Sequence, residues 1–394
     1  MNKNFWIIAL ISLINSLSTT VLIPTIYLYG RQFGLNDFQV SFLFSIYFIS
    51  QFFATPVIGK LSDRFGRKPL LIMSLTGTVI ANFIAGNANS ASLLIFARFL
   101  DGITGGNVSV AQAVISDVTP AKDRARAFNV VGATFAIGFI VGPAISLMAQ
   151  KISLGASFLV SSFIASFALI ITIFFLPETI VERSTKYRNV FDLGLGKLVT
   201  ALTMPKLGIL FVINFLLGTT FSIFTFALQP YFIHVLKQNN ESLTLLFLMI
   251  GVVAVCMQLW GVGLLINRYN LLSIFFIGLL IRSLSFMLMP LWENVIYFVI
   301  ISFLFSLFNS FVQPIITTLI SLNAKPQEQG IALGVNSSYL SISNAIGPVI
   351  AGLLVHQANP ITYSYPLYLA GFLTLLVLIL AIKSRKKYGV KENF

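Results

Sequence analysis

The sequence predicts an all-α polytopic membrane protein with 12 transmembrane helices, arranged as two pseudo-symmetric six-helix bundles. Three observations support this fold class. Of the 394 residues, 57% are hydrophobic and only 9% are charged, whereas about a quarter of the residues of a soluble protein are charged. The apolar residues form long continuous runs, and one long polar segment divides these runs into two sets of six. So few charges cannot cover a soluble surface, so a soluble protein is excluded.

Each apolar run is long enough to cross a bilayer, because a helix needs about 20 mostly apolar residues to span the hydrocarbon core. The runs cover roughly residues 5–29, 38–59, 70–86, 92–114, 127–149, 154–176, 207–232, 243–266, 271–291, 295–319, 331–355 and 367–382. They are continuous, so the alternating pattern of a transmembrane barrel does not fit them. The first run has little charge before it and no cleavage site after it, so we expect a permanent span and not a signal peptide.

The positive charge predicts the orientation of the chain. Of the 25 Lys and Arg residues, 20 lie in segments on the face that holds the N-terminus and 3 lie on the opposite face. Positively charged loops stay on the cytoplasmic side. We therefore expect a multi-pass protein of the cell (inner) membrane with both termini in the cytoplasm. The net charge of +13 sets this topology and indicates no nucleic-acid partner.

The two sets of runs are related by an internal repeat. The segment Gly59–Gly66 matches Gly263–Asn270 at an offset of 204 residues, and Gly142-Pro143 matches Gly347-Pro348 at an offset of 205. Two matches at nearly one offset indicate two related halves, as in many transporters. The predicted domains are an N-terminal six-helix bundle (1–176), a cytoplasmic linker (177–206) and a C-terminal six-helix bundle with a basic cytoplasmic tail (207–394).

The loop after the second run carries the most specific motif. Residues 59–69 read Gly-Lys-Leu-Ser-Asp-Arg-Phe-Gly-Arg-Lys-Pro, which resembles the loop signature of the major facilitator superfamily at the same place. Glycine permits close helix approach, and the charged groups can bridge helix ends. The alternative is that the four cations only enforce topology. We expect a conformational lock at Gly59, Asp63, Arg64, Gly66, Arg67 and Lys68.

The fourth run contains two ionisable residues, and Arg98-Phe-Leu-Asp101-Gly102 is similar to the membrane-embedded arginine motif of the same family. At 1.5 Å per residue, Arg98 lies about 9 Å deep, and Asp101 follows on the same helix face. Charged groups at such depth are functional candidates. We expect Asp101 to bind a proton and Arg98 to tune its affinity; the alternative is a purely structural ion pair.

The fifth run resembles the antiporter branch of the family in its glycine and proline pattern. Small residues let helices pack closely, and the expected packing residues are Gly138, Gly142, Pro143, Gly347 and Pro348. This resemblance points to the tetracycline/proton antiporters and their multidrug relatives. It also implies that the first, fourth, seventh and tenth spans line the substrate cavity. The cavity residues we expect are Asn15, Asn214, Gln229, Asn309 and Gln313, with Arg282 as a further candidate.

The sequence departs from that branch where relatives have acidic residues within spans. Asn15, Ala81 and Arg282 stand at those places, and neither Asn nor Arg can take up a proton in the relevant range. Either Asp101 alone couples transport to protons, or the chain is an exchanger or uniporter, or its substrate is of another class. No metal or other cofactor is expected, because the single cysteine and the two histidines form no ligand set.

The function predicted from these features is secondary active export of a small amphipathic compound by alternating access, in exchange for protons. The alternative is a metabolite, organic-anion or siderophore carrier of the same fold without proton coupling. A membrane-embedded enzyme is disfavoured, because the spans offer no cluster of nucleophile, base or metal ligands. The expected partners are the small-molecule substrate, protons and the lipid bilayer, and the chain is expected to be a monomer.

Overall fold

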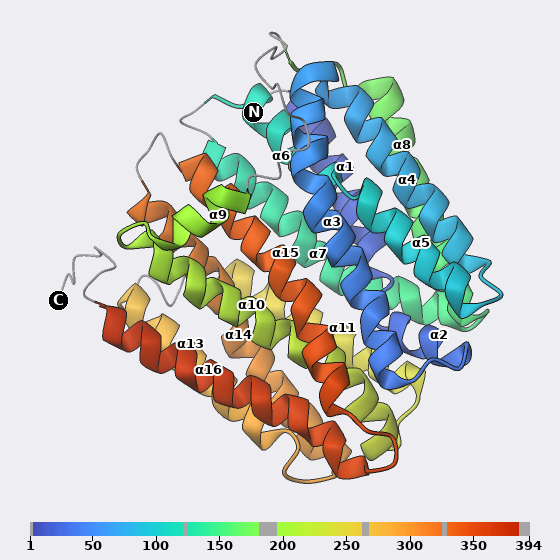
Figure 1. The fold of residues 1–394 in the computed structure, drawn as a ribbon, viewed down its shortest axis with the longest axis vertical. Helices are drawn as coiled ribbons and strands as arrows, with labels where there is room; N and C mark the ends of the chain where they lie inside the picture. The colour runs from blue at the N-terminus through green and yellow to red at the C-terminus, as the bar shows by residue number, and fades with distance from the viewer. Residues whose placement is uncertain (1–2, 121–123, 181–194, 262–267, 325–328, 386–394) are drawn as a thin grey trace. The chain divides into compact units, whose positions relative to one another are not determined.

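The computed structural model describes residues 3–120, 124–180, 195–261, 268–324 and 329–385. Within these ranges all regular secondary structure is helical, and ten helices are long and apolar enough to cross a membrane (Figure 1). The predicted fold class, an all-α multi-pass membrane protein, is confirmed. The chain divides into two compact units. The first unit comprises Met1–Leu35 with Ile46–Gly194, and the second comprises Asn36–Ser45 with Leu195–Phe394.

The first unit is built from the helices that correspond to the first six apolar runs. These are α1 (Lys3–Thr20), α2 (Ile26–Gln32), α3 (Asp37–Phe65, in this unit from Ile46), α4 (Arg67–Gly86), α5 (Ala91–Thr104), α6 (Asn107–Val118), α7 (Arg124–Gln150) and α8 (Leu154–Phe175). Helix α4 packs against α5 and α8, and α1 packs against α7 and α8. Phe5, Leu75 and Val114 are completely buried in its core. Burial of one apolar stripe on each helix holds this unit together.

The fourth predicted span is not one continuous helix. Helix α5 ends at Thr104 and α6 begins at Asn107, with Gly105 and Gly106 between them. Hydropathy over Ala91–Val118 is still that of a single span, which is why the apolar run did not reveal the break. Two adjacent glycines permit the interruption, because glycine favours a helix less than other residues apart from proline.

The second unit contains the remaining helices. These are α9 (Leu195–Leu202), α10 (Leu207–Pro230), the π-helix η2 (Tyr231–Val235), α11 (Asn240–Cys256), the π-helix η3 (Met257–Gly261), α13 (Leu271–Leu288), α14 (Val295–Asn323), α15 (Gln329–Leu354), the 3₁₀-helix η4 (Pro360–Ser364) and α16 (Tyr365–Ser384). Helix α10 packs against α15 and α16, and α13 lies beside α14 and α16 (Figure 1). The core contains Phe211, Leu217, Phe275 and Ile316, which are completely buried.

Ten of the predicted runs therefore correspond to the ten spanning helices. The first run corresponds to α1 with α2, and the eighth corresponds to α11 with η3. Part of the predicted repeat, Gly263 with Leu265 and Asn267, lies outside the described residues. The bundle boundaries expected from the sequence stay a prediction.

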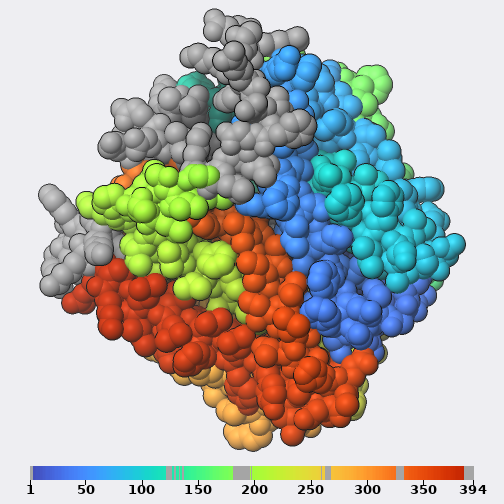
Figure 2. Space-filling model, viewed as in Figure 1, coloured from blue at the N-terminus to red at the C-terminus, as the bar shows by residue number. Residues whose placement is uncertain are grey.

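Large apolar side chains are exposed along single faces of the helices. On α16, coloured red in Figure 2, they are Phe372, Leu376, Ile379 and Ile382, and each of these residues is 42–52% exposed. Their spacing of three and four residues places them on one stripe of the helix. Such a stripe on a hydrophobic helix is suited to contact with lipid, which accounts for much of the aromatic and aliphatic content of the chain.

Candidate functional site

Arg98 and Asp101 form a buried ion pair within α5. The Nη1 atom of Arg98 lies 3.1 Å from Oδ2 of Asp101, and both residues are only 6% exposed. Their spacing of three places both side chains on one face of α5, as the sequence predicted. The guanidinium also lies over the ring of Tyr47 on α3, at 4.4 Å from its Cζ atom to the ring centroid. Thr78 on α4 adds a hydrogen bond to the carboxylate.

The break between α5 and α6 lies one turn beyond this ion pair. Its carbonyl groups need hydrogen-bond donors, because an unsatisfied group in the bilayer core costs several kcal/mol. The amide Nε2 of Gln51 donates to the carbonyl oxygen of Gly105 at 3.0 Å. The hydroxyl of Ser74 donates to the carbonyl oxygen of Thr104. Side chains from α3 and α4 thus stabilise the interruption in α5–α6.

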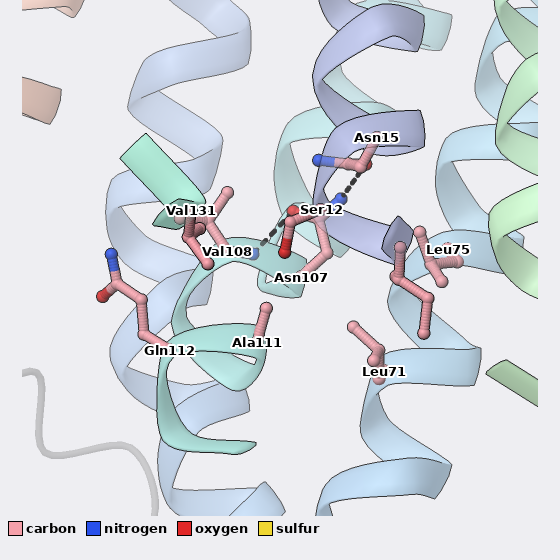
Figure 3. A pocket seen from close by; sticks show the side chains of 10 residues that line it. Ser12, Asn15, Leu71, Leu75, Asn107, Val108, Ala111, Gln112 and Val131 are labelled. Atoms are coloured by element: carbon pink, nitrogen blue, oxygen red, sulfur yellow. Dashed lines mark hydrogen bonds between the residues drawn. The ribbon is translucent and has the colours of Figure 1, made fainter. Parts of the chain in front are cut away.

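Helix α6 continues from the break into the wall of a pocket, shown in Figure 3. Asn107 in its first turn donates from Nδ2 to Oδ1 of Asn15 on α1, at 2.8 Å. The pocket encloses about 40 Å³, and about 430 Å³ when the open solvent at its mouth is counted. Its lining residues are Ile11, Ser12, Asn15, Leu71, Leu75, Asn107, Val108, Ala111, Gln112 and Val131. The lining is apolar with a few neutral hydrogen-bonding groups, and none of these ten described residues is titratable.

The second unit holds a comparable group of amides. Asn214 on α10 donates from Nδ2 to Oδ1 of Asn336 on α15 at 2.5 Å, and Gln313 on α14 donates to Oδ1 of Asn214 at 3.1 Å. Two of the expected cavity residues, Asn214 and Gln313, are therefore in contact. Gln229 is completely buried and donates to the carbonyl oxygen of Thr225 on its own helix at 3.3 Å.

Arg282 on α13 is 3% exposed and connects three helices of the second unit. Its Nη2 atom donates to the carbonyl oxygen of Leu217 at 2.8 Å and to Oγ1 of Thr220 at 2.7 Å. Its Nη1 atom donates to Oδ1 of Asn309 at 3.0 Å. All these acceptors are neutral, and the part of the chain described forms no salt bridge to this guanidinium. Arg282 therefore differs from Arg98, whose charge is balanced by Asp101.

The predicted lock residues lie at the turn between α3 and α4. Nη1 of Arg67 contacts Oδ1 of Asp63 at 2.5 Å, and its Nε contacts Oδ2 of Asp117 on α6 at 3.1 Å. Gly66 has φ +114°, a conformation that side-chain-bearing residues rarely adopt. The guanidinium of Arg64 lies over the ring of Phe65, with its Cζ atom 5.3 Å from the ring centroid. The structure brings Asp63, Gly66 and Arg67 together, whereas a side chain on Gly59 would meet open space.

Glu178, in the segment after α8, binds the first turn of α4. Its Oε1 accepts from the backbone N–H of Arg67 at 2.9 Å, and its Oε2 accepts from that of Lys68 at 3.2 Å. Partial burial raises the pKa of Glu178, but these two donors and the backbone N–H groups of Thr179 and Ile180 outweigh it, so the pKa lies below its ordinary value of 4.5. A carboxylate at a helix N-terminus is stabilised by the unpaired N–H groups and the helix dipole.

Glu178→Gln is expected to destabilise the protein at neutral pH by about 0.3–1 kcal/mol, because it removes the charge at the start of α4. Since the folded-state pKa is lowered, this stabilisation is present above pH 4.5 and is lost as the pH falls through the folded-state value. The measurement is the apparent melting temperature of purified protein at pH 7 and at pH 3–4. Glu293→Gln, at an exposed acid between α13 and α14, is the matched control. Equal melting temperatures for Glu178→Gln and wild type at pH 7 would contradict this role.

Small residues bring pairs of helices close together in both units. A Cβ on Gly138 or Gly142 of α7 would collide with Ser16 or Thr20 of α1, and one on Gly347 of α15 would collide with Ser222 of α10. Thr20 also donates to the carbonyl oxygen of Gly138 at 2.8 Å. Pro143 and Pro348 lie inside α7 and α15. The corresponding glycines of the two halves thus make the same kind of contact.

The cavity residues favoured from the sequence did not include Tyr47, Gln51, Asn107 and Asn336, which the structure places at these sites. All lie within apolar runs. Asn107 and Asn336 can be noticed as amides in a span, but most such residues only join helices. Tyr47 and Gln51 are four residues apart on α3, and nothing in their own run indicates contact with α5 or with the break after it.

Comparison with known proteins agrees with this architecture. The family model of the Major Facilitator Superfamily matches residues 8–209 and 210–393. Multidrug resistance protein 2 of Bacillus subtilis (strain 168) is 24% identical over 370 residues, covering 93% of this chain and 91% of that protein. The class H tetracycline resistance protein of Pasteurella multocida is 26% identical over 391 residues, covering 96% of this chain and 94% of that protein.

Among solved structures, the human organic anion transporter MFSD10 (TETRAN) has a TM-score of 0.74 at 19% identity, covering 96% of this chain and 100% of that chain. At that identity the likeness shows the fold. The family model, by contrast, covers nearly the whole sequence in two consecutive matches, one for each half. The chain therefore belongs to the Major Facilitator Superfamily of membrane transporters.

Proposed function

We propose that this transporter exports a small amphipathic compound from the cytoplasm by alternating access, in exchange for protons bound at Asp101. The observation that carries the proposal is the buried Arg98–Asp101 pair at 3.1 Å, directly before a helix break whose far side lines a pocket. A carboxylate at membrane depth is costly to keep and is characteristic of proton relays in transporters.

Protonation of Asp101 changes the energy of the first unit. While the carboxylate is charged, it balances the buried guanidinium of Arg98. When it binds a proton, the ion pair loses one of its two charges, and loss of one member of such a pair typically costs about 3–5 kcal/mol. The protein can lower that cost by admitting water or by moving Arg98 toward another partner. Proton binding thus favours a different conformation, which is what coupled exchange requires.

The pocket in the first unit supports an amphipathic substrate. Leu71, Leu75 and Val131 supply apolar walls, and Asn15 with Asn107 supplies neutral donors and acceptors. Such a lining binds rings and hydrocarbon parts while the amides orient hydrogen-bonding substituents. The names of the relatives, a multidrug resistance protein and a tetracycline resistance protein, favour the same class of compound. Asn214 and Gln313 contribute a second group of amides in the other unit.

In this proposal the cluster of Asp63, Gly66 and Arg67, with Asp117 and Glu178, holds the outward-facing state. The ion pair between Arg67 and Asp117 joins the α3–α4 turn to α6, so separation of these helices must break it. The excess of Lys and Arg on the face of the N-terminus favours both termini in the cytoplasm of a cell (inner) membrane. The proposed transporter is a monomer with bundles at 1–176 and 207–394, joined by the linker 177–206.

A second candidate function is export of an organic anion without proton coupling. Arg282 favours it, because this buried cation has only neutral hydrogen-bond partners within the described residues. An anionic substrate group nearby would balance its charge. The fold likeness to a transporter described as an organic anion transporter is compatible with this candidate but does not distinguish it.

One experiment separates the two candidates. Everted membrane vesicles that contain the protein are energised with a pH gradient, acid inside, and uptake of tetracycline or of an aromatic carboxylate such as benzoate is measured. Proton-coupled drug export predicts tetracycline uptake that stops when nigericin removes the gradient. The organic-anion candidate predicts carboxylate exchange that persists with nigericin. Vesicles without the protein supply the background, and tetracycline uptake at that background would reject the preferred substrate class.

A further inference from the structure

We propose that Gln51 is the positioning residue that transmits the charge state of the Arg98–Asp101 pair to the pocket at Asn15 and Asn107. The inference rests on the proposed function, because it takes Asp101 as the proton-binding group. It adds a route between two sites that lie on opposite sides of a helix break. Every step of this route is a contact within the first unit.

The first step links the ion pair to α3. The guanidinium of Arg98 lies over the ring of Tyr47, with its Cζ 4.4 Å from the ring centroid. One helical turn further along α3, Gln51 donates from Nε2 to the hydroxyl oxygen of Tyr47 at 3.2 Å. A cation over a ring is held by the electron density of the ring face. Displacement of Arg98 therefore changes the force on the Tyr47 ring. Tyr47 in turn accepts a hydrogen bond from Gln51.

The second step links α3 to the helix break. The same Nε2 atom of Gln51 donates to the carbonyl oxygen of Gly105 at 3.0 Å. A side-chain amide has two N–H groups on this nitrogen, so the contacts with Tyr47 and Gly105 use both of them. Gln51 cannot follow a movement of Tyr47 without weakening its bond to Gly105. Because water is absent from the bilayer core, the Gly105 carbonyl would then have to find another donor by moving.

The third step links the break to the pocket. Asn107 follows Gly105 by two residues and begins α6. Its Nδ2 donates a hydrogen bond to Oδ1 of Asn15 at 2.8 Å, and its neighbour Val108 and Ala111 on the next turn line the same pocket (Figure 3). Any shift of the first turn of α6 thus changes the distance between the two amides and the shape of the apolar wall. A discontinuous helix is a suitable place for such movement, as in other transporters.

Among the side chains around the Arg98–Asp101 pair, Asp101 is the one whose charge changes when a proton binds. Arg98 faces it from α5, Tyr47 faces it from α3, and Thr78 contributes a hydroxyl from α4. The charged residues of α4, Arg67 and Lys68, lie at its start, about three turns from Thr78. Within the described residues, the change in charge that Gln51 transmits is therefore that of Asp101.

The test is a double-mutant cycle read by hydrogen–deuterium exchange on the full-length protein in nanodiscs. Asp101→Asn mimics the protonated carboxyl, because Asn has a similar shape and no charge. Gln51→Met keeps the length of the side chain and removes both hydrogen bonds. Ser74→Ala is the matched control, because Ser74 binds the neighbouring carbonyl of Thr104 in the same break. The observable is the exchange rate of peptides that cover Gly105–Val118.

Asp101→Asn is expected to accelerate exchange in these peptides by at least about fivefold, the low end of typical coupling between sites. In the Gln51→Met background, the same substitution should change the rate by less than about twofold. In the Ser74→Ala background it should keep its full effect. A merely structural role for Gln51 would accelerate exchange in Gln51→Met but leave the effect of Asp101→Asn additive.

Three results would overturn the inference: no effect of Asp101→Asn on α6, an additive effect in the Gln51→Met background, or equal loss of the effect in both backgrounds. If Gln51→Met does not fold, Gln51→Asn replaces it, because its shorter amide cannot reach Tyr47 and Gly105 at once. Failure of the proposed function is seen separately, as pH-driven uptake by vesicles that survives Asp101→Asn. The exchange cycle requires no substrate, so it reports on the route alone.

Discussion

Asp101→Asn is expected to reduce pH-gradient-driven uptake of tetracycline into everted vesicles to the background of vesicles without the protein. Asn preserves the hydrogen bonds that Arg98 and Thr78 donate but cannot take up a proton. No other acid is placed to replace it within the described residues, since the remaining carboxylates lie in first or last turns or between helices. The measurement is the initial rate of uptake with and without nigericin.

The substitution should leave uncoupled exchange intact. Tetracycline counterflow in the absence of a pH gradient is expected to stay near the wild-type rate, which separates loss of coupling from loss of folding. Glu241→Gln, at an exposed acid in the first turn of α11, is the matched control and should retain pH-driven uptake. Wild-type pH-driven uptake by Asp101→Asn would disprove the role of Asp101 in coupling.

Arg98→Met is expected to destabilise the first unit by about 3–5 kcal/mol, because it removes one member of a buried ion pair. Asp101 is only 6% exposed, so water does not compensate for the missing guanidinium. The double substitution Arg98→Met with Asp101→Asn removes both charges and should recover most of the loss. The measurement is the apparent melting temperature of the four proteins of this cycle in one detergent.

Strong non-additivity is the sign of a true ion pair in this cycle. Arg282→Met provides a comparison in the second unit, where the guanidinium binds neutral oxygens of Leu217, Thr220 and Asn309. Its removal leaves no unpaired carboxylate among the described contacts. Arg282→Met should therefore lower the stability of the protein less than Arg98→Met. Additive losses from Arg98→Met and Asp101→Asn would mean that the two side chains act independently, and the coupling scheme would have to be abandoned.

The energetic coupling proposed for the first unit depends on one short interruption. If α5 and α6 were a continuous helix, the carbonyl groups near Gly105 would be bonded within the helix and would be insensitive to side chains of α3. The interruption makes two of these groups depend on Gln51 and Ser74. A change at Asp101 can therefore reach the pocket through hydrogen bonds that have few alternatives in a dry environment.

Much of the fold could be predicted from the sequence because a bilayer imposes a simple length rule. Ten of the twelve apolar runs correspond to helices long enough to span. The pairing of Arg98 with Asp101 was also predictable, since a spacing of three places two side chains on one helix face. The packing glycines Gly142 and Gly347 were visible through their repeat, and both prove to face a neighbouring helix closely.

The break after Thr104 and the partners of the amides could not be predicted in the same way. Hydropathy is continuous across Gly105 and Gly106, and one of the two donors that stabilise this break, Gln51, is 54 residues away from Gly105. The contact of Asn15 with Asn107 joins residues 92 apart. A periodicity argument concerns one helix at a time, so it cannot state which face of one helix meets which residue of another.

The sequence alone therefore determined that this chain is a two-part helical membrane protein with one carboxylate and two arginines inside its apolar runs, because length, hydropathy and local spacing are properties of the chain itself. Only the tertiary structure decided that Asp101 balances Arg98 while Arg282 binds neutral oxygens. It also decided that Gln51 joins the Gly105 carbonyl at the helix break to Tyr47, whose ring lies against Arg98. These facts depend on packing between helices, where contacts form between residues that are distant in the chain.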